Sequence, residues 1–248
     1  QITIVAEHRK KKAEQHITLT TRIANWLTGQ TNITPNINGQ LNMAMRADFA
    51  GKDIDSSSGE LLISNFSFSD SIRTANAKQM LLKIDSDAKN NKEISIVSDH
   101  INANVSGQFK YADVINEIYR QLYTHANALL DKRPQSKIGN VNLTMNLNYS
   151  DINQYLQFIE SNLKISNDGS ISGNINSTDN ASMFQINIGD IESGQWRIND
   201  FNGIVKSNVE NISVTLDVAN VSMPTLGNVG ALSLHYVLSY NIMDTDLE

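Results

Sequence analysis

Histidine and acidic side chains are the groups of this chain that could hold a metal ion or move a proton. The five histidines are His8, His16, His100, His125 and His235, and the chain has no cysteine. Zinc sites use paired histidines at i and i+4 on a helix or histidines clustered with acidic partners, and the sequence offers neither pattern. We therefore predict no metal site, no cofactor and, without cysteine, no disulfide or thiol nucleophile.

The acidic pairs fall in or beside predicted turns. Residues 85–90 begin like a calcium-binding loop, but Lys89 occupies the fifth place and Ile96 the twelfth, where a glutamate would be needed. Asp53 and Asp55 form a similar pair in a turn, where solvation is the ordinary expectation. The sequence contains no nucleophile elbow, phosphate-binding glycine loop or dinucleotide fingerprint. It therefore predicts a protein that is not an enzyme.

The charge balance bears on the class of partner. Lysine and arginine number 20 and aspartate and glutamate 26, which gives a formal net charge of −6. Proteins that bind nucleic acid by neutralising phosphates need an excess of cations, so no nucleic-acid partner is predicted. The basic run at 8–12 has two interpretations. It marks a solvated hairpin loop, as charge runs usually do, or it contacts anionic lipid headgroups or an acidic partner.

The elements that must position any site are mainly strands. Residues 140–149 read NVNLTMNLNY, in which polar and apolar side chains alternate without a break. Successive strand side chains point to opposite faces, so this segment predicts a strand with one apolar and one polar face. Short, even spacing between turns favours antiparallel hairpins. The same pattern predicts strands over about 2–7, 16–26, 39–49, 60–68, 78–86, 93–98, 100–110, 138–149, 170–176, 182–188, 194–206, 210–221 and 230–242.

Two segments have helical periodicity instead. Apolar residues recur at steps of three and four between residues 112 and 130, with Asp113 as a plausible cap, and predict an amphipathic helix. A shorter helix is expected over about 151–162, capped by Ser150. The first helix has two interpretations. It lies as a gate over a groove formed by the apolar face of the strands, or it caps one end of the sheet, and in both cases its apolar stripe is buried. The stripe consists of Val114, Ile118, Leu122 and Leu129.

The sheet must hide its apolar face, which is the main structural problem that this pattern sets. It needs a second sheet, a helical layer, closure into a barrel or an apolar ligand. Two short helices cannot cover so many strands, which leaves a self-packed sandwich or barrel, or an open groove filled by lipid. The aromatic content of 6% suits slim acyl chains and ordinary sandwiches alike. The residues expected to line a groove are Ile94, Ile96, Ile101, Val105, Phe109, Val141, Leu143, Met145, Leu147, Ile212, Val214, Leu216 and Val218.

Part of the chain resembles a known family. Residues 94–113 read ISIVSDHINANVSGQFKYAD and lead into the predicted helix, and residues 59–68 read GELLISNFSF. This style is similar to the central region of TamB-type translocation and assembly module proteins of Bacteroidetes-like bacteria, within the AsmA-like superfamily. The later strands from Ile171 through Phe201 fit the same style, and the resemblance is clearest over about 59–220.

The resemblance implies a fold and a function. The expected fold is mainly β, a long curved antiparallel sheet that forms a taco-like hydrophobic groove interrupted by two amphipathic helices. The expected function is that of a periplasmic bridge-like protein that carries phospholipid acyl chains between the inner and outer membranes and supports outer-membrane biogenesis. A TamA- or BamA-like outer-membrane β-barrel protein is the implied partner. An inner-membrane anchor is implied as well, outside this piece.

Alternatives to the lipid bridge follow from the same pattern. An assembly chaperone would pair its sheet edges with nascent outer-membrane strands, and a secreted or surface β-sandwich would serve as a binding module. The chain begins at Gln1 within a strand-like run and ends in Asp246-Leu247-Glu248, which favours an excised piece. We expect β-rich groove segments at 1–111 and 163–248 and a helical insertion with one strand at 112–162, all within one continuous domain.

Overall fold

The computed structural model describes residues 1–11, 14–28, 39–126, 139–224, 227–239 and 242–247. They form one sheet of 17 strands, together with the helices α1 (Tyr111–Ala126) and α2 (Asn153–Ile159) and the short 3-10 helix η2 (Ile54–Ser56). The strands are β1 (Ile2–Lys11), β2 (Glu14–Leu27), β3 (Gln40–Gly51), β4 (Ser58–Ser69), β5 (Thr74–Ser86), β6 (Asn91–Ser98), β7 (Ile101–Gln108), β8 (Asn142–Ser150), β9 (Leu163–Ile165), β10 (Asp168–Asn176), β11 (Ala181–Ser193), β12 (Trp196–Ser207), β13 (Ile212–Val218), β14 (Asn220–Met223), β15 (Gly227–Val229), β16 (Leu232–Ser239) and β17 (Ile242–Leu247).

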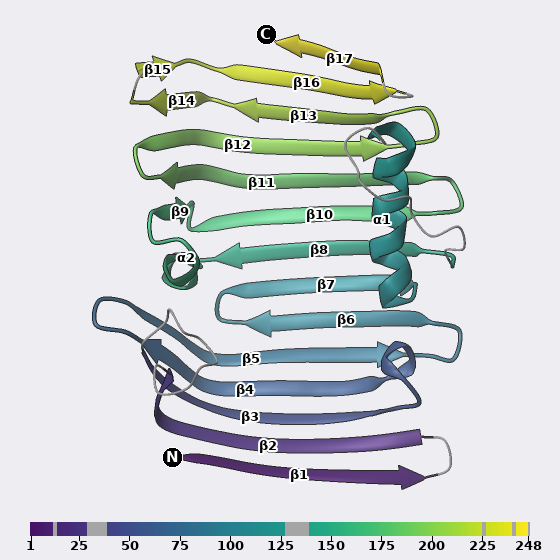
Figure 1. The fold of residues 1–248 in the computed structure, drawn as a ribbon, viewed down its shortest axis with the longest axis vertical. Helices are drawn as coiled ribbons and strands as arrows, with labels where there is room; N and C mark the ends of the chain where they lie inside the picture. Colours follow the sequence, from purple (N-terminus) through teal and green to yellow (C-terminus); the bar gives the residue numbers. More distant parts are fainter. Residues whose placement is uncertain (12–13, 29–38, 127–138, 225–226, 240–241, 248) are drawn as a thin grey trace.

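The strands follow one another as an antiparallel meander (Figure 1). From β1 to β8 each strand pairs with the next along the chain, and β8 then pairs with β10 across the α2 connection. The meander continues through β11, β12, β13, β16 and β17. The short strands β9 and β14 pair with the ends of β11 and β12, and β15 pairs with β14. The predicted antiparallel pairing of strands that follow one another in the sequence is therefore confirmed along the sheet.

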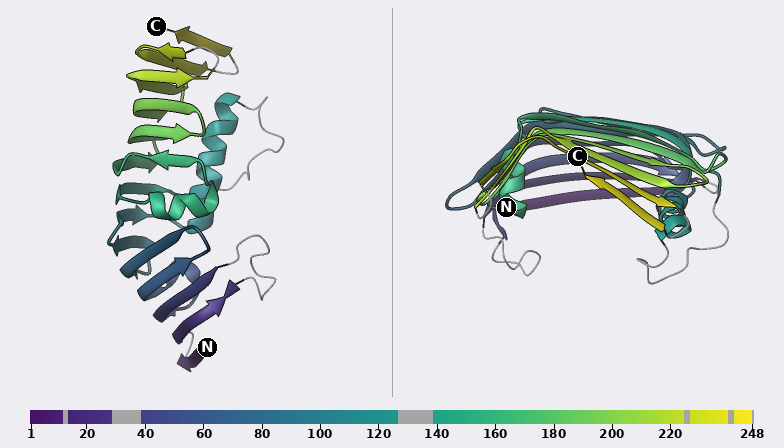
Figure 2. Two further views of the ribbon diagram at one scale, coloured as in Figure 1. Left: turned by 90° about the vertical axis from the view of Figure 1, so that its left-hand side faces the viewer. Right: turned by 90° about the horizontal axis from the view of Figure 1, so that it is seen from above.

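The sheet is a single curved layer. Figure 2 shows it as an arch in cross-section, with α1 and α2 inside the arch at opposite flanks. The solvent-accessible area is 15537 Å², whereas a compact monomer of 27.5 kDa exposes about 11,000 Å². No second sheet packs on this one within the described ranges. The predicted long curved antiparallel sheet with two helices is confirmed, and the described strands do not form a sandwich.

The register places apolar and polar side chains on opposite faces. Ile94 lies opposite Val105, and Val105 lies opposite Met145. One residue along, Asn104 lies opposite Asn146. A one-residue slip between strands would exchange the two faces, so pairs of this kind fix the register of each strand against its neighbour. The result is a concave face of aliphatic side chains and a convex face rich in asparagine and serine.

β-Bulges bend the flank that carries α2. The register shifts by one residue near Asn25 in β2, near Asn65 in β4 and near Gly189 and Asp200 in the β11–β12 pair. All four residues have positive φ, between 53° and 72°. A bulge adds an unpaired residue and bends its strand. The ends of β2, β4 and β11 lie at this flank (Figure 1), so the bulges turn its edge inward.

Two glycines allow close strand approach at the other flank. Gly59 and Gly107 have φ of +156° and +145°, a region that other residues rarely adopt. A Cβ on Gly107 would collide with the carbonyl oxygen of Asn142, and one on Gly59 would collide with that of Asp48. Glycine at these positions lets neighbouring strands stay paired where the sheet curves.

The strands agree closely with the sequence prediction, and three short ones were missed. Each predicted strand has an observed counterpart, and the segment expected at 210–221 divides into β13 and β14. The strands β9, β15 and β17 were not predicted as separate elements, since β9 and β15 have only three residues each and show too little alternation. The basic run was expected in a loop, but its residues from His8 to Lys11 belong to β1.

The helices differ from the prediction at their ends. Asp113 lies within the first turn of α1, which begins at Tyr111, so its expected role as a cap is wrong. Ser150 belongs to β8, and the N-cap of α2 is Ile152, whose side chain makes no capping hydrogen bond. The two pairings of β8 hold Ser150 in the sheet, which removes it from the capping position.

Replacing Gly107 by alanine tests whether these glycines shape the sheet. Gly107→Ala should lower the free energy of unfolding by about 1–3 kcal/mol, because a residue with a Cβ is strained at this φ and meets the β8 backbone. Urea unfolding measures the loss. Gly230→Ala is the control, since a Cβ there meets no atom within 4 Å. Equal stability of the two variants would contradict this role.

Candidate functional site

The predicted lining residues all lie on the concave face. The cross-strand register joins those on β6, β7, β8 and β13 through residues of β10, β11 and β12 on the same face. Phe109, Val141, Leu143 and Ile212 are buried. The other nine are half-buried: Ile94, Ile96, Ile101, Val105, Met145, Leu147, Val214, Leu216 and Val218. The sheet brings them together as one surface, and most of that surface stays partly open.

The cluster of buried apolar side chains close to α1 at one flank is small. It consists of Phe109, Val141, Leu143 and Ile175. Elsewhere the concave face continues apolar without such cover, through Leu61 and Leu82 toward β1 and through Leu216 and Leu234 toward β17. We call this continuous concave surface the trough. It runs across the strands along the long axis of the sheet.

A hollow of about 360 Å³ lies between α1 and the trough. The sheet contributes Ile94, Val105, Phe109, Leu143, Met145, Ile175 and Phe184, and the helix contributes Tyr111, Val114, Ile115 and Ile118. Five predicted groove residues and two predicted gate residues therefore line the same hollow. Because α1 runs across the strands, it forms a wall along the trough and leaves the length of the trough open (Figures 1 and 2).

Helix α1 buries only part of its apolar stripe, with Tyr111 and Val114 packed against the buried cluster of the sheet. Its buried residues include Glu117, 1% exposed, and Gln121, 6% exposed. Ile115 is 72% exposed, and Ile118 and Leu122 are each 41% exposed. An amphipathic helix on a globular protein normally buries its apolar stripe. The expectation that Ile118 and Leu122 would be buried is therefore wrong, and Leu129 lies outside the described residues.

Hydrogen bonds to polar side chains hold the middle of α1 against the sheet. The Arg120 guanidinium donates to both carboxylate oxygens of Glu117 at 2.8 and 2.6 Å and to Asn180 Oδ1 at 2.5 Å. Gln121 donates to Glu117 at 2.8 Å and accepts from the Ser182 hydroxyl at 2.7 Å. The ion pair with Glu117 raises the pKa of Arg120. Burying Glu117 is tolerable only because its charge is paired and hydrogen-bonded.

A second polar cluster holds the start of α1. The side chain of Lys92 is fully buried. Its ammonium group donates to the Phe109 carbonyl at 2.5 Å and lies 3.6 Å from the Asp55 carboxylate. It also lies 5.1 Å from the Phe109 ring and 5.2 Å from the Tyr111 ring. Asp55 in turn accepts from the Tyr111 backbone N–H at 2.9 Å. Asp55 is therefore more than the solvated turn acid that the sequence indicated.

Helix α2 forms the wall at the opposite flank. Its Phe158 ring packs edge-on against Phe68 at 4.9 Å, and its Tyr155 ring lies 6.4 Å from Phe66. Arg73 lies over the Phe158 ring and donates to the Gln157 carbonyl near the helix end. The trough thus has a helical wall on each side.

Other contacts fix α2 to the sheet and affect the acidity of its tyrosine. Tyr155 donates its hydroxyl to the Asn76 carbonyl at 2.6 Å. Desolvation by burial, with a smaller contribution from Asp99, raises the pKa of Tyr155. The Arg73 side chain holds the pKa of Asp70 at about 2, below its usual 3.8, with further help from the Ile72 backbone N–H.

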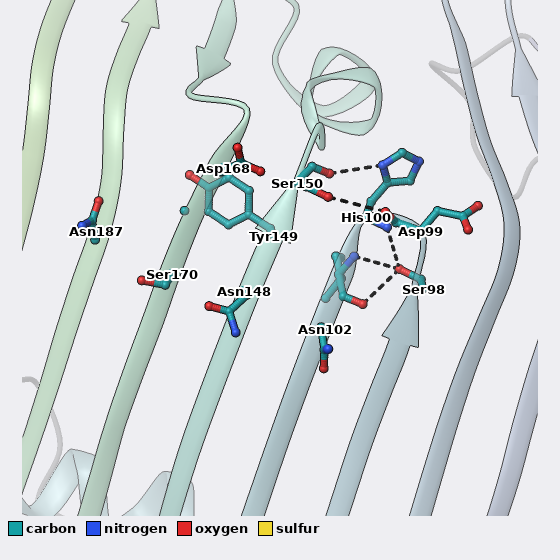
Figure 3. Close-up of a pocket in the computed structure, with 12 residues that line it drawn as sticks. Ser98, Asp99, His100, Asn102, Asn148, Tyr149, Ser150, Asp168, Ser170 and Asn187 are labelled. Carbon is teal, nitrogen blue, oxygen red and sulfur yellow. Dashed lines mark hydrogen bonds between the residues drawn. The ribbon is translucent and has the colours of Figure 1, made fainter.

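A polar hollow of about 510 Å³ lies where β6, β7, β8 and β10 end near α2 (Figure 3). Ser98 Oγ accepts from the backbone N–H groups of His100 and Ile101 at 3.2 and 2.9 Å. His100 Nδ1 lies 3.2 Å from the Ser150 carbonyl, and its Nε2 lies 2.9 Å from Gln154. These contacts fix the turn between β6 and β7 and tie it to α2. They are explained by structure alone.

Sequence reasoning missed the residues that turn α1. Glu117, Arg120, Gln121 and Lys92 were not singled out, and neither were the hollow-lining residues Phe184 and Ile175. Glu117 and Arg120 stand three apart, the spacing of a helical ion pair, which was the one local signal available. The burial of Glu117 depends on hydrogen bonds that Arg120 and Gln121 make with Asn180 and Ser182, about sixty residues away, so no local pattern could reveal it.

In the described parts of the chain, no three or more His, Asp or Glu side chains are grouped so that they could hold a metal ion. The helices among these residues are too short or too polar to cross a membrane. Comparisons with protein-family models, curated proteins and solved structures gave no match. The trough and its walls are therefore the features of the described chain that bear on function.

Removing Glu117 should loosen α1 without disrupting the sheet. In Glu117→Ala the Arg120 and Gln121 groups lose their shared partner, which should lower the free energy of unfolding by about 1–3 kcal/mol. Hydrogen exchange should show faster exchange of α1 amides and unchanged exchange in β2 to β5. Thr124→Ala, at an exposed position of α1, is the control. Unchanged α1 protection in Glu117→Ala would show that the buried pair does not hold the helix.

The Asp70 carboxylate should make the α2 wall sensitive to acid. Its folded-state pKa of about 2 lies below its usual 3.8, so its stabilising contribution is complete above about pH 4 and lost as the pH falls through about 2. Asp70→Asn should lower the urea midpoint at pH 6, and its difference from wild type should vanish near pH 2. Glu60→Gln, at an exposed strand position, should match wild type throughout. A difference that is constant with pH would exclude this carboxylate as the cause.

Proposed function

We propose that this chain is a section of a bridge-like protein that carries phospholipid acyl chains between two membranes. The single observation that carries the proposal is the unbroken concave apolar face, into which α1 turns Ile115 and Ile118 while it buries Glu117 and Gln121. A helix that directs its aliphatic residues toward an open apolar surface is stable in this orientation when apolar material fills the space. Acyl chains fit this requirement.

A trough of this kind suits a moving chain. Burying apolar area contributes about 25 cal/mol per Å², and this contribution has no preferred direction. Along most of the trough each strand offers a similar aliphatic row, for example Leu82 opposite Ile96 and Leu216 opposite Leu234. A chain that slides from one row to the next therefore exchanges one contact for an equal one, so it can be held and still move.

The setting is part of the proposal and comes from the resemblance to TamB-type proteins. In that setting the protein works in the periplasm, is anchored in the inner membrane and supports outer-membrane biogenesis together with a TamA- or BamA-like β-barrel partner. The net charge of −6 favours a partner other than nucleic acid. The apolar trough supports the lipid in this proposal, and the compartment and the barrel partner rest on the resemblance.

A second candidate is an assembly chaperone that pairs its edge with client strands. The strand β1 favours it, because among the described strands β1 pairs with β2 alone, Ile2, Ile4 and Val5 are exposed, and residues 2–6 carry no charge or proline. Such an edge is a template for strand addition. Photo-crosslinkers separate the two candidates. A crosslinker at Val5 should capture client polypeptide if the protein is a chaperone, and one at Leu216 should capture lipid if it is a carrier.

Placing a charge in the trough tests the lipid function. Leu216→Asp should reduce co-purified phospholipid several-fold with a modest loss of stability, because Leu216 is only half-buried. Leu143→Asp is unsuitable as the main test, since Leu143 belongs to the buried core and a charge there should unfold the α1 region. Mass spectrometry of extracted lipid and thermal unfolding are the measurements.

Ser213→Asp is the matched control, because Ser213 lies three residues away on the same strand and on the convex face. It should retain the wild-type lipid. If the wild-type protein carries no phospholipid, or if both variants lose it equally, the trough is not the carrier surface.

A further inference from the structure

The hollow beneath α1 has a defined volume, which distinguishes it from the rest of the trough. Its lining extends from Ile94 on β6 to Phe184 on β11. The five neighbouring strands β6, β7, β8, β10 and β11 lie about 4.8 Å apart, so together they span about 19 Å. For comparison, the acyl chains of one bilayer leaflet are about 15 Å long. The volume of about 360 Å³ holds about a dozen methylene-sized groups at about 30 Å³ each, the share of one water molecule in the liquid.

The volume of the hollow determines how many acyl chains can enter it. Two chains of about fifteen carbons need about 900 Å³ on the same scale, more than twice what the hollow provides. One chain of about a dozen carbons fills it. The second chain of a diacyl lipid would therefore lie outside, in the open trough.

The lining matches an uncharged chain better than a polypeptide. All eleven lining residues are aliphatic or aromatic, or methionine, and none is charged. A polypeptide would bring backbone N–H and C=O groups into a space without partners for them, at a cost that an acyl chain avoids. The hollow is also continuous with the trough, since Ile94 and Val105 neighbour Ile96 and Ala103 on the same face.

We propose that the hollow between α1 and strands β6 to β11 is a sized site for one acyl chain within an otherwise uniform trough. The inference rests on the proposed function and adds a preferred position that covers about a dozen carbons of a chain more fully than the open trough does. Its dimensions are set in advance because polar clusters hold both parts of the wall, Lys92 with Asp55 at the start of α1 and Glu117 with Ser182 through Gln121 farther along. A wall fixed before binding selects by size.

A chain-length series tests the size limit. Saturated single-chain lysophosphatidylcholines, kept below their micelle concentrations, displace a fluorescent fatty-acid analogue from the full chain. Affinity should rise about fourfold per added methylene, which is the factor given by about 0.8 kcal/mol per buried CH₂. The rise should become shallower beyond about a dozen carbons, because further methylenes leave the hollow and enter the open trough, where the sheet alone covers them. We call this chain length the limit. A uniform trough would show one slope throughout.

Substitutions at Val105 should move that limit in opposite directions. Val105→Phe fills part of the hollow and should shift the limit to shorter chains, whereas Val105→Ala enlarges it and should shift the limit to longer ones. Val214→Phe is the matched control, because Val214 is also a half-buried strand valine on the concave face but does not line the hollow. It should leave the limit unchanged. Thermal unfolding verifies that each variant is folded.

The outcomes separate this inference from the proposed function. A limit that moves with Val105 and not with Val214 supports the sized site. Affinity that rises with one unchanged slope past about sixteen carbons, or a limit that responds equally to both valines, overturns the sized site and leaves a lipid-carrying trough. No displacement by any chain length, together with no co-purified phospholipid, overturns both.

Discussion

The structure depends on one constraint, which is that a single pleated layer cannot cover its own apolar face. Register places Val105 beside Met145 and continues the same face from row to row. The bulges at Asn25 and Asn65 and the glycine at Gly107 curve the layer into an arch but do not close it. The large solvent-accessible area follows directly. Whatever completes the apolar face must come from outside the described sheet.

Helix α1 is the clearest consequence of that constraint. Its polar residues Glu117 and Gln121 reach the sheet, and its isoleucines face the open space. A buried ion pair contributes little net stability compared with apolar packing, so it is a poor choice for attachment alone. It does fix orientation, because Arg120 binds Glu117 through two hydrogen bonds of defined geometry. The wall is therefore placed precisely while its aliphatic side stays available.

The strands and their faces could be predicted because the signal is local. In residues 140–149 alternation alone assigns Leu143 and Leu147 to one face, and strand register then carries that assignment across the sheet. The groove residues therefore gather on one surface as predicted. The orientation of α1 could not be predicted, since it depends on Asp55 and Ser182, which lie far from the helix in sequence. The apolar stripe in the sequence shows which residues share a face of the helix. It does not show whether that face points toward the sheet or away from it.

A carrier surface has to satisfy two demands that conflict. Movement requires that no position holds the chain much better than the next, which the repeated aliphatic rows provide. Retention requires at least one position where a chain loses contact with water on more than one side, and the hollow beneath α1 offers this because helix and sheet both line it. Each methylene enclosed there contributes about 0.8 kcal/mol at most, so a dozen would hold a chain firmly if all were fully covered. Because the hollow opens into the trough, coverage is partial, and the chain is detained without being trapped.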